Sequence, residues 1–280
     1  MKNKVNSLNR ARMSKLAIHA VLIAGSLIMV MPFVWMFLTS FKTYGESIAI
    51  PLTFLPEEWR LDNYQEVNQR VNFLILYINT IIVIVARVLC ALVFSSMAGY
   101  AFSRLQFRGR NALFSIVIIQ MMIPSQVGTI PQYLMTAKLG LLDTVAGIVF
   151  PGIVSAFGAF FMRQAFMSLP HELEEAAKID GCNHWQIFYR VMLPQVKTPM
   201  MALSIFTALF AWKDLMWPLI INVSPDKMTI SAGLAMLKGQ FLVDYPVIMA
   251  GAVFSTLPMI LIYICLQKHF VEGVATSGIK

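Results

Sequence analysis

Six apolar segments divide this chain, and they constrain its fold more than any other feature of the sequence. They run over residues 16–40, 73–97, 113–133, 145–167, 200–221 and 246–267. A helix of about 20 apolar residues spans the hydrocarbon core of a bilayer, and lipid offers its backbone no hydrogen-bonding partner outside the helix. The segments therefore predict an all-α, polytopic membrane protein with six transmembrane helices.

The composition excludes a soluble globular protein and a disordered one. Hydrophobic residues make up 58% of the 280 residues and charged residues 13%, whereas soluble domains have about 45–50% and about 25%. The basic residues behind the formal net charge of +8 flank the apolar segments. Membrane topology explains basic residues beside apolar segments, so we expect a lipid bilayer and no nucleic acid as partner. The cysteines Cys90, Cys182 and Cys265 are too scattered to predict a disulfide framework or a metal site.

The distribution of basic residues predicts which side of the membrane each loop faces. Fourteen of the 22 Lys and Arg residues lie on one side, in residues 1–15, 104–110, 163–197 and 268–280, and six lie on the other. Because basic residues concentrate in cytoplasmic loops, both termini are expected in the cytoplasm. The prediction is a transmembrane domain over residues 16–267 between two cytosolic tails. The first apolar segment is too long for the core of a signal peptide and is expected to remain as an anchor.

The loop between the fourth and fifth apolar segments, residues 168–199, carries helix signals of its own. Pro170 suits the first position of a helix, and three acidic residues follow it in the opening turns, where they complement the positive end of the helix dipole. They are Glu172, Glu174 and Glu175. The pattern predicts a short cytosolic helix.

The same loop contains the signals for a sharp turn and a second helix. Gly181 can end the first helix, because glycine readily takes a positive φ. Asn183 can cap the second helix with Gln186 as its capping-box partner, and Pro194 marks its end. The resulting cytosolic helix-turn-helix is either an interfacial hairpin that joins two spans or a rigid element that docks on a cytosolic partner and transmits its movement.

The residues of this loop resemble the EAA loop of ABC importer permeases. Glu175-Ala176-Ala177 is followed after three residues by Gly181 and, after nine more, by Val191-x-Leu193-Pro194. The pattern of the family is Glu-Ala-Ala, three residues, Gly, nine residues, Ile-x-Leu-Pro, so Val191 is the one departure. The full spacing, in the loop before the penultimate span, makes the resemblance specific.

Further segments resemble the carbohydrate-uptake type of these permeases, and the resemblance covers essentially the whole chain. The segments are Ala98–Asn111, Trp212-Lys213-Asp214-Leu215-Met216-Trp217-Pro218-Leu219 and Phe270–Gly273. The family has Asn where this chain has Lys213. Six spans and a short cytosolic tail match the smaller of the two permeases, similar to that of the maltose transporter.

The resemblance implies half of a translocation channel in the plasma membrane of a prokaryote. It implies four partners: a second homologous permease subunit, two copies of an ATPase subunit, an extracytoplasmic solute-binding protein and a carbohydrate substrate. In the family, the helix around the EAA glycine couples to a cleft of the ATPase. Carried over to this chain, the ATPase-coupling residues are Glu175, Ala176, Ala177, Asp180 and Gly181.

The nucleotide is expected on the partner and not on this chain. The sequence has no Gly-x-x-x-x-Gly-Lys-Ser/Thr loop, which is the motif that cradles phosphates in ATPases. We therefore expect a transport subunit and not an enzyme, with ATP and Mg²⁺ held by the ATPase and with no metal or other cofactor bound here.

Charges inside the predicted spans are functional candidates by default. They are Arg87, Lys213 and Asp214. For Arg87 we favour a structural role, such as an interhelical pair that holds the subunit interface, while cavity lining and helix packing are both open for Asp214. Trp212 and Trp217 can stack on sugar rings or anchor the chain at the membrane interface. Together with Asp214, they are the candidate residues of a translocation path.

The third apolar segment is expected to bend around Pro124, Gly128 and Pro131, as a gate or as a tilted helix. The alternative function is a stand-alone secondary transporter or channel, which would need inverted repeats or a complete charged relay. A membrane enzyme would need convergent catalytic groups at one depth. The sequence shows none of these features. The substrate stays open among mono-, di- and oligosaccharides and a polyol phosphate.

Overall fold

The computed structural model describes residues 2–237 and 243–278, and the regular structure of these residues is entirely helical. The prediction of an all-α protein is therefore confirmed for the described chain. The helices are α1 Lys2–Thr39, α2 Tyr44–Ile48, α3 Asp62–Arg70, α4 Phe73–Arg104, α5 Arg110–Met122, α6 Thr129–Lys138, α7 Val145–Val149, α8 Ala156–Met167, α9 Glu172–Ile179, α10 His184–Gln186, α11 Leu193–Gln195, α12 Lys197–Lys213, α13 Met216–Ile221, α14 Ile230–Met236 and α15 Tyr245–Gly278. The predicted tails, residues 1–15 and 268–280, fall within α1 and α15, apart from residues 1, 279 and 280, which lie outside the described residues.

The chain forms two compact units. Unit 1 comprises residues 1–70 and 237–257, and unit 2 comprises residues 71–236 and 258–280. Helix α15 begins in unit 1 and ends in unit 2, and its internal proline, Pro258, lies at the change. The candidate sites described below belong to unit 2.

Unit 1 contains an ordered segment directly after α1. The Lys42 side chain is 1% exposed, donates from Nζ to the Thr53 carbonyl and lies 4.7 Å from the centre of the Trp35 ring. Asn63 Nδ2 donates to the carbonyls of Ser40 and Lys42, each at 2.9 Å. A buried ammonium group needs such partners. The contacts of Lys42 and Asn63 together hold the segment after α1 in place.

Among the described helices, two are individually long and apolar enough to cross a membrane, residues Met13–Thr39 of α1 and helix α4. Two bent pairs meet the same criterion when each pair is taken together: Arg110–Met122 with Ser125–Lys138, and Val145–Gly152 with Ala156–Met167. Up to four spans are thus supported by length and composition. The fifth predicted span is interrupted after α12, and the sixth, residues 246–267, falls within α15. The count of six spans stays a prediction.

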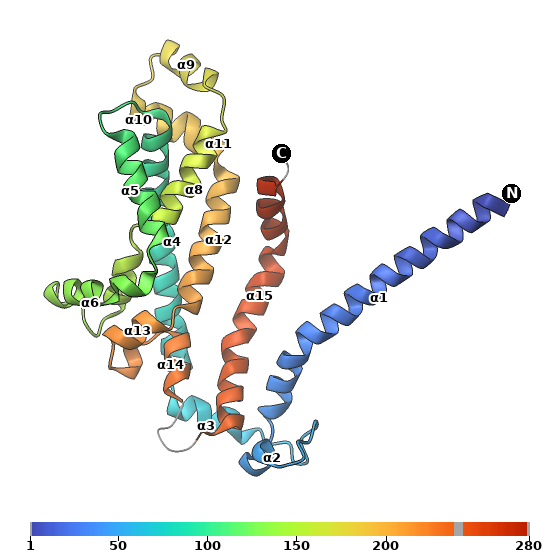
Figure 1. Ribbon diagram of the computed structural model, residues 1–280. Coiled ribbons are helices and arrows are strands. Elements are labelled where there is room, and N and C mark those ends of the chain that lie inside the picture. The colour runs from blue at the N-terminus through green and yellow to red at the C-terminus, as the bar shows by residue number, and fades with distance from the viewer. Residues whose placement is uncertain (1, 238–242, 279–280) are drawn as a thin grey trace. The chain divides into compact units, whose positions relative to one another are not determined.

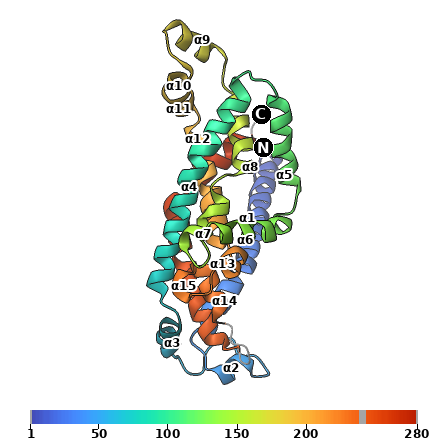
Figure 2. The ribbon, with the colours of Figure 1, turned by 90° about the vertical axis from the view of Figure 1, so that its left-hand side faces the viewer.

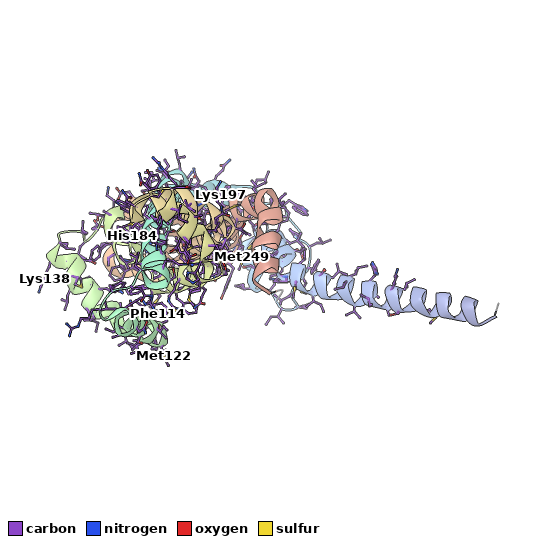
Figure 3. The ribbon with its side chains drawn as sticks, turned by 90° about the horizontal axis from the view of Figure 1, so that it is seen from above. Phe114, Met122, Lys138, His184, Lys197 and Met249 are labelled. Atoms are coloured by element: carbon purple, nitrogen blue, oxygen red, sulfur yellow. The ribbon has the colours of Figure 1, made fainter. Side chains whose placement is uncertain are left out.

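The predicted bend in the third apolar segment is confirmed. Helix α5 ends at Met122, and Ile123 has an extended backbone (φ −82°, ψ 124°), as expected for a residue that precedes a proline. The next helical segment, Ser125–Lys138, is turned by 101° relative to α5. The third apolar segment is therefore bent and is not one straight, tilted helix. Viewed from the α9 end, α6 extends to one side of unit 2 with Lys138 at its tip (Figure 3).

Helices α4, α8 and α12 lie side by side and form the centre of unit 2 (Figure 1). A Cβ atom added at Gly99 of α4 would lie 2.6 Å from Met162 Cβ of α8, so the two helices approach more closely there than any larger residue allows. Such small-residue contacts are a common way to pack membrane helices. Helices α9 and α10 lie at one end of this bundle, and α13 and α14 lie at the opposite end (Figures 1 and 2).

Candidate functional site

The EAA residues form α9 and a tight turn at one end of the unit 2 bundle (Figure 1). Gly181 follows the helix with φ +79°, a conformation that side chains other than glycine rarely adopt. The Gly181 amide donates to the Lys178 carbonyl and the Cys182 amide donates to the Ala177 carbonyl, each at 3.0 Å. These two bonds define a Schellman motif, so the end of α9 depends on the glycine that the sequence pattern singles out.

The two helical parts of this segment begin in different ways. Helix α9 begins at Glu172, so Pro170 lies just outside it and not at its first position. The second part begins with the expected capping box: the Gln186 amide donates to Asn183 Oδ1 at 2.9 Å, and the Asn183 amide donates to Gln186 Oε1 at 2.8 Å. It continues as a π-helical stretch over Ile187–Met192 and ends in α11.

The inner face of the segment packs against the bundle. Ile187, Phe188 and Met192 are buried in one apolar cluster with Tyr100 of α4 and Phe166 of α8. The rings of Tyr100 and Phe188 lie 5.2 Å apart. A force on this segment therefore acts directly on α4 and α8, because close-packed side chains transmit displacement.

Arg104, the last residue of α4, ties α8 to the start of α9. Its Nε donates to the Phe166 carbonyl at 3.1 Å and its Nη2 to the Leu169 carbonyl at 2.5 Å. Its Nη1 donates to His171 Nδ1 at 3.0 Å. Its Nε also lies 3.4 Å from Glu174 Oε1, with the two side chains 1% and 10% exposed. One guanidinium group thus binds both ends of the connection between α8 and α9.

Four of the five predicted coupling residues lie at the surface. Glu175, Ala176, Asp180 and Gly181 are exposed, whereas Ala177 is 5% exposed and packs in the apolar cluster. Two large apolar side chains are exposed near them, Ile179 at 86% and Trp185 at 59%. The outer surface of the segment therefore combines small, acidic and apolar groups.

The second candidate site surrounds an ion pair inside the bundle. Helix α12 ends at Lys213, α13 begins at Met216, and Asp214 lies between them in an extended conformation. Arg87, near the middle of α4, donates from Nη1 to Asp214 Oδ2 at 2.9 Å and from Nη2 to the Ile148 carbonyl at 2.6 Å. The expected interhelical pair of Arg87 is thus made within this chain, and it connects α4, α7 and the break between α12 and α13.

A cavity of about 300 Å³ opens beside this ion pair. Polar groups from the α5–α6 bend line one part of it, and apolar side chains from α13 line another. The lining residues are Arg87, Ser125, Gln126, Thr129, Gln132, Pro151, Gly152, Asp214, Met216, Trp217 and Ile220. The bend of the third apolar segment therefore supplies the neutral polar groups of the cavity.

The two candidate tryptophans occupy different places. Trp217 lines the cavity and is only 8% exposed, and its Nε1 donates to the Gly147 carbonyl at 3.0 Å. Trp212 is 7% exposed and does not line the cavity, and its carbonyl accepts the Ser231 hydroxyl. Lys213 is exposed and lies over the Phe210 ring, so it does not compete with Arg87 for Asp214.

Asp143 holds the loop that follows α13. Its Oδ1 accepts the amides of Val223 and Ser224 at 3.0 and 2.9 Å, and its Oδ2 accepts the Ser224 hydroxyl at 2.5 Å. The Ser224 hydroxyl, the Ser224 amide and the Val223 amide hold the pKa of Asp143 below its ordinary value, because they donate to the ionised carboxylate. The backbone of Asp143 has φ +54°, a conformation that aspartate tolerates better than most residues.

Sequence reasoning missed several residues of these sites. Arg104 lies within Ala98–Asn111, a stretch that resembles the family, but its basic character indicated only membrane sidedness. Gln126, Thr129 and Gln132 recur every three residues beside Pro124. That repeat of polar groups within an apolar segment is the signal that indicates a cavity lining.

Comparison with known proteins agrees with this organisation. The family model described as "binding-protein-dependent transport system inner membrane component" matches residues 91–276. The chain is 34% identical over 256 residues to the arabinooligosaccharides transport system permease protein AraQ of Halalkalibacterium halodurans. The aligned region covers 90% of this chain and 92% of AraQ.

Two solved structures have a similar fold. A bacterial ABC transporter involved in the import of the acidic polysaccharide alginate contains a chain with a TM-score of 0.80 and 27% identity, covering 92% of this chain and 97% of that one. The bacterial alginate ABC transporter in complex with an alginate pentasaccharide-bound periplasmic protein shares the fold, with a TM-score of 0.63, 15% identity and coverage of 88% and 91%. Because the family model matches more than half of the chain and AraQ is 34% identical over 90% of it, this protein belongs to the family of binding-protein-dependent transport system inner membrane components.

Proposed function

We propose that this chain is the smaller permease subunit of an ATP-driven importer of carbohydrates. It forms half of the translocation path with a second, homologous permease. The observation that carries the proposal is the α9–α11 segment, whose sequence has the EAA pattern and whose turn at Gly181 is a Schellman motif. The relatives named for arabinooligosaccharide transport and alginate import support a carbohydrate as substrate.

The proposed subunit spans the prokaryotic plasma membrane six times, with both termini in the cytoplasm. In addition to the supported spans, α12 with α13 makes the fifth crossing and α15 the sixth. The excess of basic residues on the side of the α9–α11 segment supports this orientation.

The proposed coupling surface is the exposed side of α9 and its turn. Glu175, Ala176, Asp180 and Gly181 contact the ATPase, and Ala177 supports them from within the apolar cluster. Closure of the ATPase moves this surface, and Arg104 passes the movement to α4 and α8 through its bonds to the Phe166 and Leu169 carbonyls. A rigid element of this kind can shift a transporter between two states.

The proposed translocation path passes the cavity beside Arg87. Asp214 and Trp217 line it directly, whereas Trp212, the third candidate residue, is buried outside this lining. ATP and Mg²⁺ bind to two copies of an ATPase subunit and not to this chain. An extracytoplasmic solute-binding protein delivers the substrate, in keeping with the alginate transporter complexed with its periplasmic protein.

Affinity purification of the chain from its native membranes, followed by mass spectrometry, tests the proposal. We expect an ATPase, a second permease and, with substrate present, a solute-binding protein. A tagged unrelated membrane protein purified in the same detergent controls for unspecific capture. A homo-oligomer without an ATPase, in detergent that preserves known transporter complexes, would contradict the proposal and favour the secondary transporter or channel.

A further inference from the structure

The cavity beside Arg87 carries information on the charge of the solute. Its lining contains one cation and one anion, Arg87 and Asp214, and the remaining polar side chains are uncharged. We infer that this cavity takes a neutral polyhydroxylated sugar and disfavours an anionic one such as a uronate or a sugar phosphate. The inference rests on the proposed function and narrows its substrate class.

The ion pair leaves the cavity without net charge. Arg87 Nη1 lies 2.9 Å from Asp214 Oδ2, and the side chains are 11% and 21% exposed. An anion that enters the cavity competes with Asp214 for the guanidinium group and comes close to the Asp214 carboxylate. The two negative charges then lie close together where few water molecules screen them, so they repel each other strongly.

The neutral part of the lining matches the hydrogen-bonding character of sugars. Hydroxyl and amide side chains can both donate and accept hydrogen bonds, as sugar hydroxyls do. Four such side chains line the cavity: Ser125, Gln126, Thr129 and Gln132. On this side of the cavity a sugar finds partners of either kind, whereas a carboxylate or phosphate can only accept.

The apolar part of the lining suits the carbon face of a sugar ring. Trp217, Met216 and Ile220 supply it, and the bond from Trp217 Nε1 to the Gly147 carbonyl fixes the indole ring. Flat aromatic surfaces next to polar groups are typical of sites that bind sugars.

Direct binding to the assembled importer tests the inference without selection by the solute-binding protein. The complex of both permeases and the ATPase is purified without that protein. Equilibrium dialysis then measures its affinity for two radiolabelled probes of equal length, an arabinose trisaccharide and a galacturonate trisaccharide. We expect the neutral probe to bind at least about tenfold more tightly.

Two variants link the preference to the ion pair. In Asp214→Asn, Arg87 keeps its charge without a counter-ion, so affinity for the galacturonate probe should rise about tenfold relative to the neutral probe. The double variant Arg87→Gln with Asp214→Asn has no charge in the cavity, so it should return to the neutral preference. If Asp214→Asn fails to assemble, the double variant and Gln126→Ala, which should weaken the neutral probe severalfold, still test the site.

Three results would overturn the inference: tighter binding of the galacturonate probe to the unaltered complex, no change of preference in Asp214→Asn, or no binding of either probe. ATP hydrolysis stimulated by the solute-binding protein is measured in the same preparations. If this stimulation persists, the importer function stands while the assignment of the cavity fails. If it is absent from the unaltered complex, the proposed function itself fails.

Discussion

Among single residues, Gly181 has the most specific requirement, because its positive φ closes the turn after α9 and a Cβ atom there would meet nothing within 4 Å. The requirement is therefore one of backbone conformation and not of space. Asparagine tolerates this conformation better than alanine does. If backbone conformation is the requirement, asparagine should replace Gly181 better than alanine does, although asparagine is larger.

We expect Gly181→Ala to insert and assemble but to couple poorly. The left-handed backbone costs an alanine about 1–2 kcal/mol, so the turn shifts and substrate-stimulated ATP hydrolysis of the reconstituted importer falls about tenfold. Gly181→Asn should retain more activity than Gly181→Ala. Gly25→Ala is the matched control, because a Cβ atom at Gly25 also meets nothing within 4 Å and its backbone has no positive φ. Equal activity of Gly181→Ala and Gly25→Ala would contradict a role for the turn in coupling.

Arg104 and Glu174 should show strong energetic coupling. Arg104→Ala leaves the Glu174 carboxylate, whose side chain is 10% exposed, without its cationic partner, which we expect to cost about 3–5 kcal/mol. Glu174→Gln should cost less, because Arg104 keeps its carbonyl acceptors. A double-mutant cycle on thermal unfolding of the purified complex gives the interaction energy. Additive effects of the two changes would show that the pair does not connect α4 to α9.

The features of the fold that can be predicted from the sequence are those that depend only on residues close together in the chain. The turn at Gly181, the capping box at Asn183 and the bend after Pro124 all depend on local backbone chemistry. The break at Asp214 has no such signal, since its partner Arg87 lies 127 positions away. Likewise, the EAA spacing marks α9 as a candidate contact surface, but the inward position of Ala177 follows from packing on α4 and α8. Contacts between distant residues cannot be read from one sequence alone.

The contact between α4 and α8 should be sensitive to one methyl group. A Cβ atom at Gly99 would lie 2.7 Å from the Met162 carbonyl carbon and 2.8 Å from the Arg163 nitrogen, both backbone atoms that cannot rotate away. We expect Gly99→Ala to destabilise the protein by about 1–3 kcal/mol, measured as a lower unfolding temperature in detergent. Gly128→Ala is the control, because its Cβ would meet only the flexible Gln132 side chain, at 3.6 Å. Similar unfolding temperatures for both variants would mean that the helices do not approach this closely.

The loop after α13 should depend on the charge of Asp143 in a defined pH range. Because the folded pKa is lowered, the stabilisation is fully present above the unfolded pKa of about 3.9 and is lost as the pH falls through the lowered folded pKa. Hydrogen exchange at the Val223 and Ser224 amides, corrected for the intrinsic rate, should therefore not change between pH 6 and 8. Asp143→Ala should speed this exchange, whereas Asp143→Asn, which keeps one acceptor oxygen, should speed it less. A change in protection near neutral pH would contradict this assignment.

For the whole molecule, the proposed translocation path requires six membrane crossings. The long helices and bent pairs support up to four spans, and the fifth and sixth crossings are proposed for α12 with α13 and for α15. An even number of spans leaves both termini on one side in either case, so the termini cannot distinguish four spans from six. The loop between α13 and α14 can, because only the fifth crossing takes it to the outside.

Asp226, in that loop, is therefore the deciding position. Its side chain is 56% exposed, so Asp226→Cys, in a chain whose native cysteines have been replaced, should react with a membrane-impermeant thiol reagent on intact cells. Trp59→Cys is the outside control and Arg108→Cys the inside control, which should react only after the membrane is opened. With six spans, the cysteine at 226 reacts like that at 59. If it reacts like that at 108, α12 and α13 do not cross the membrane, and the proposed path past Asp214 loses its outer opening.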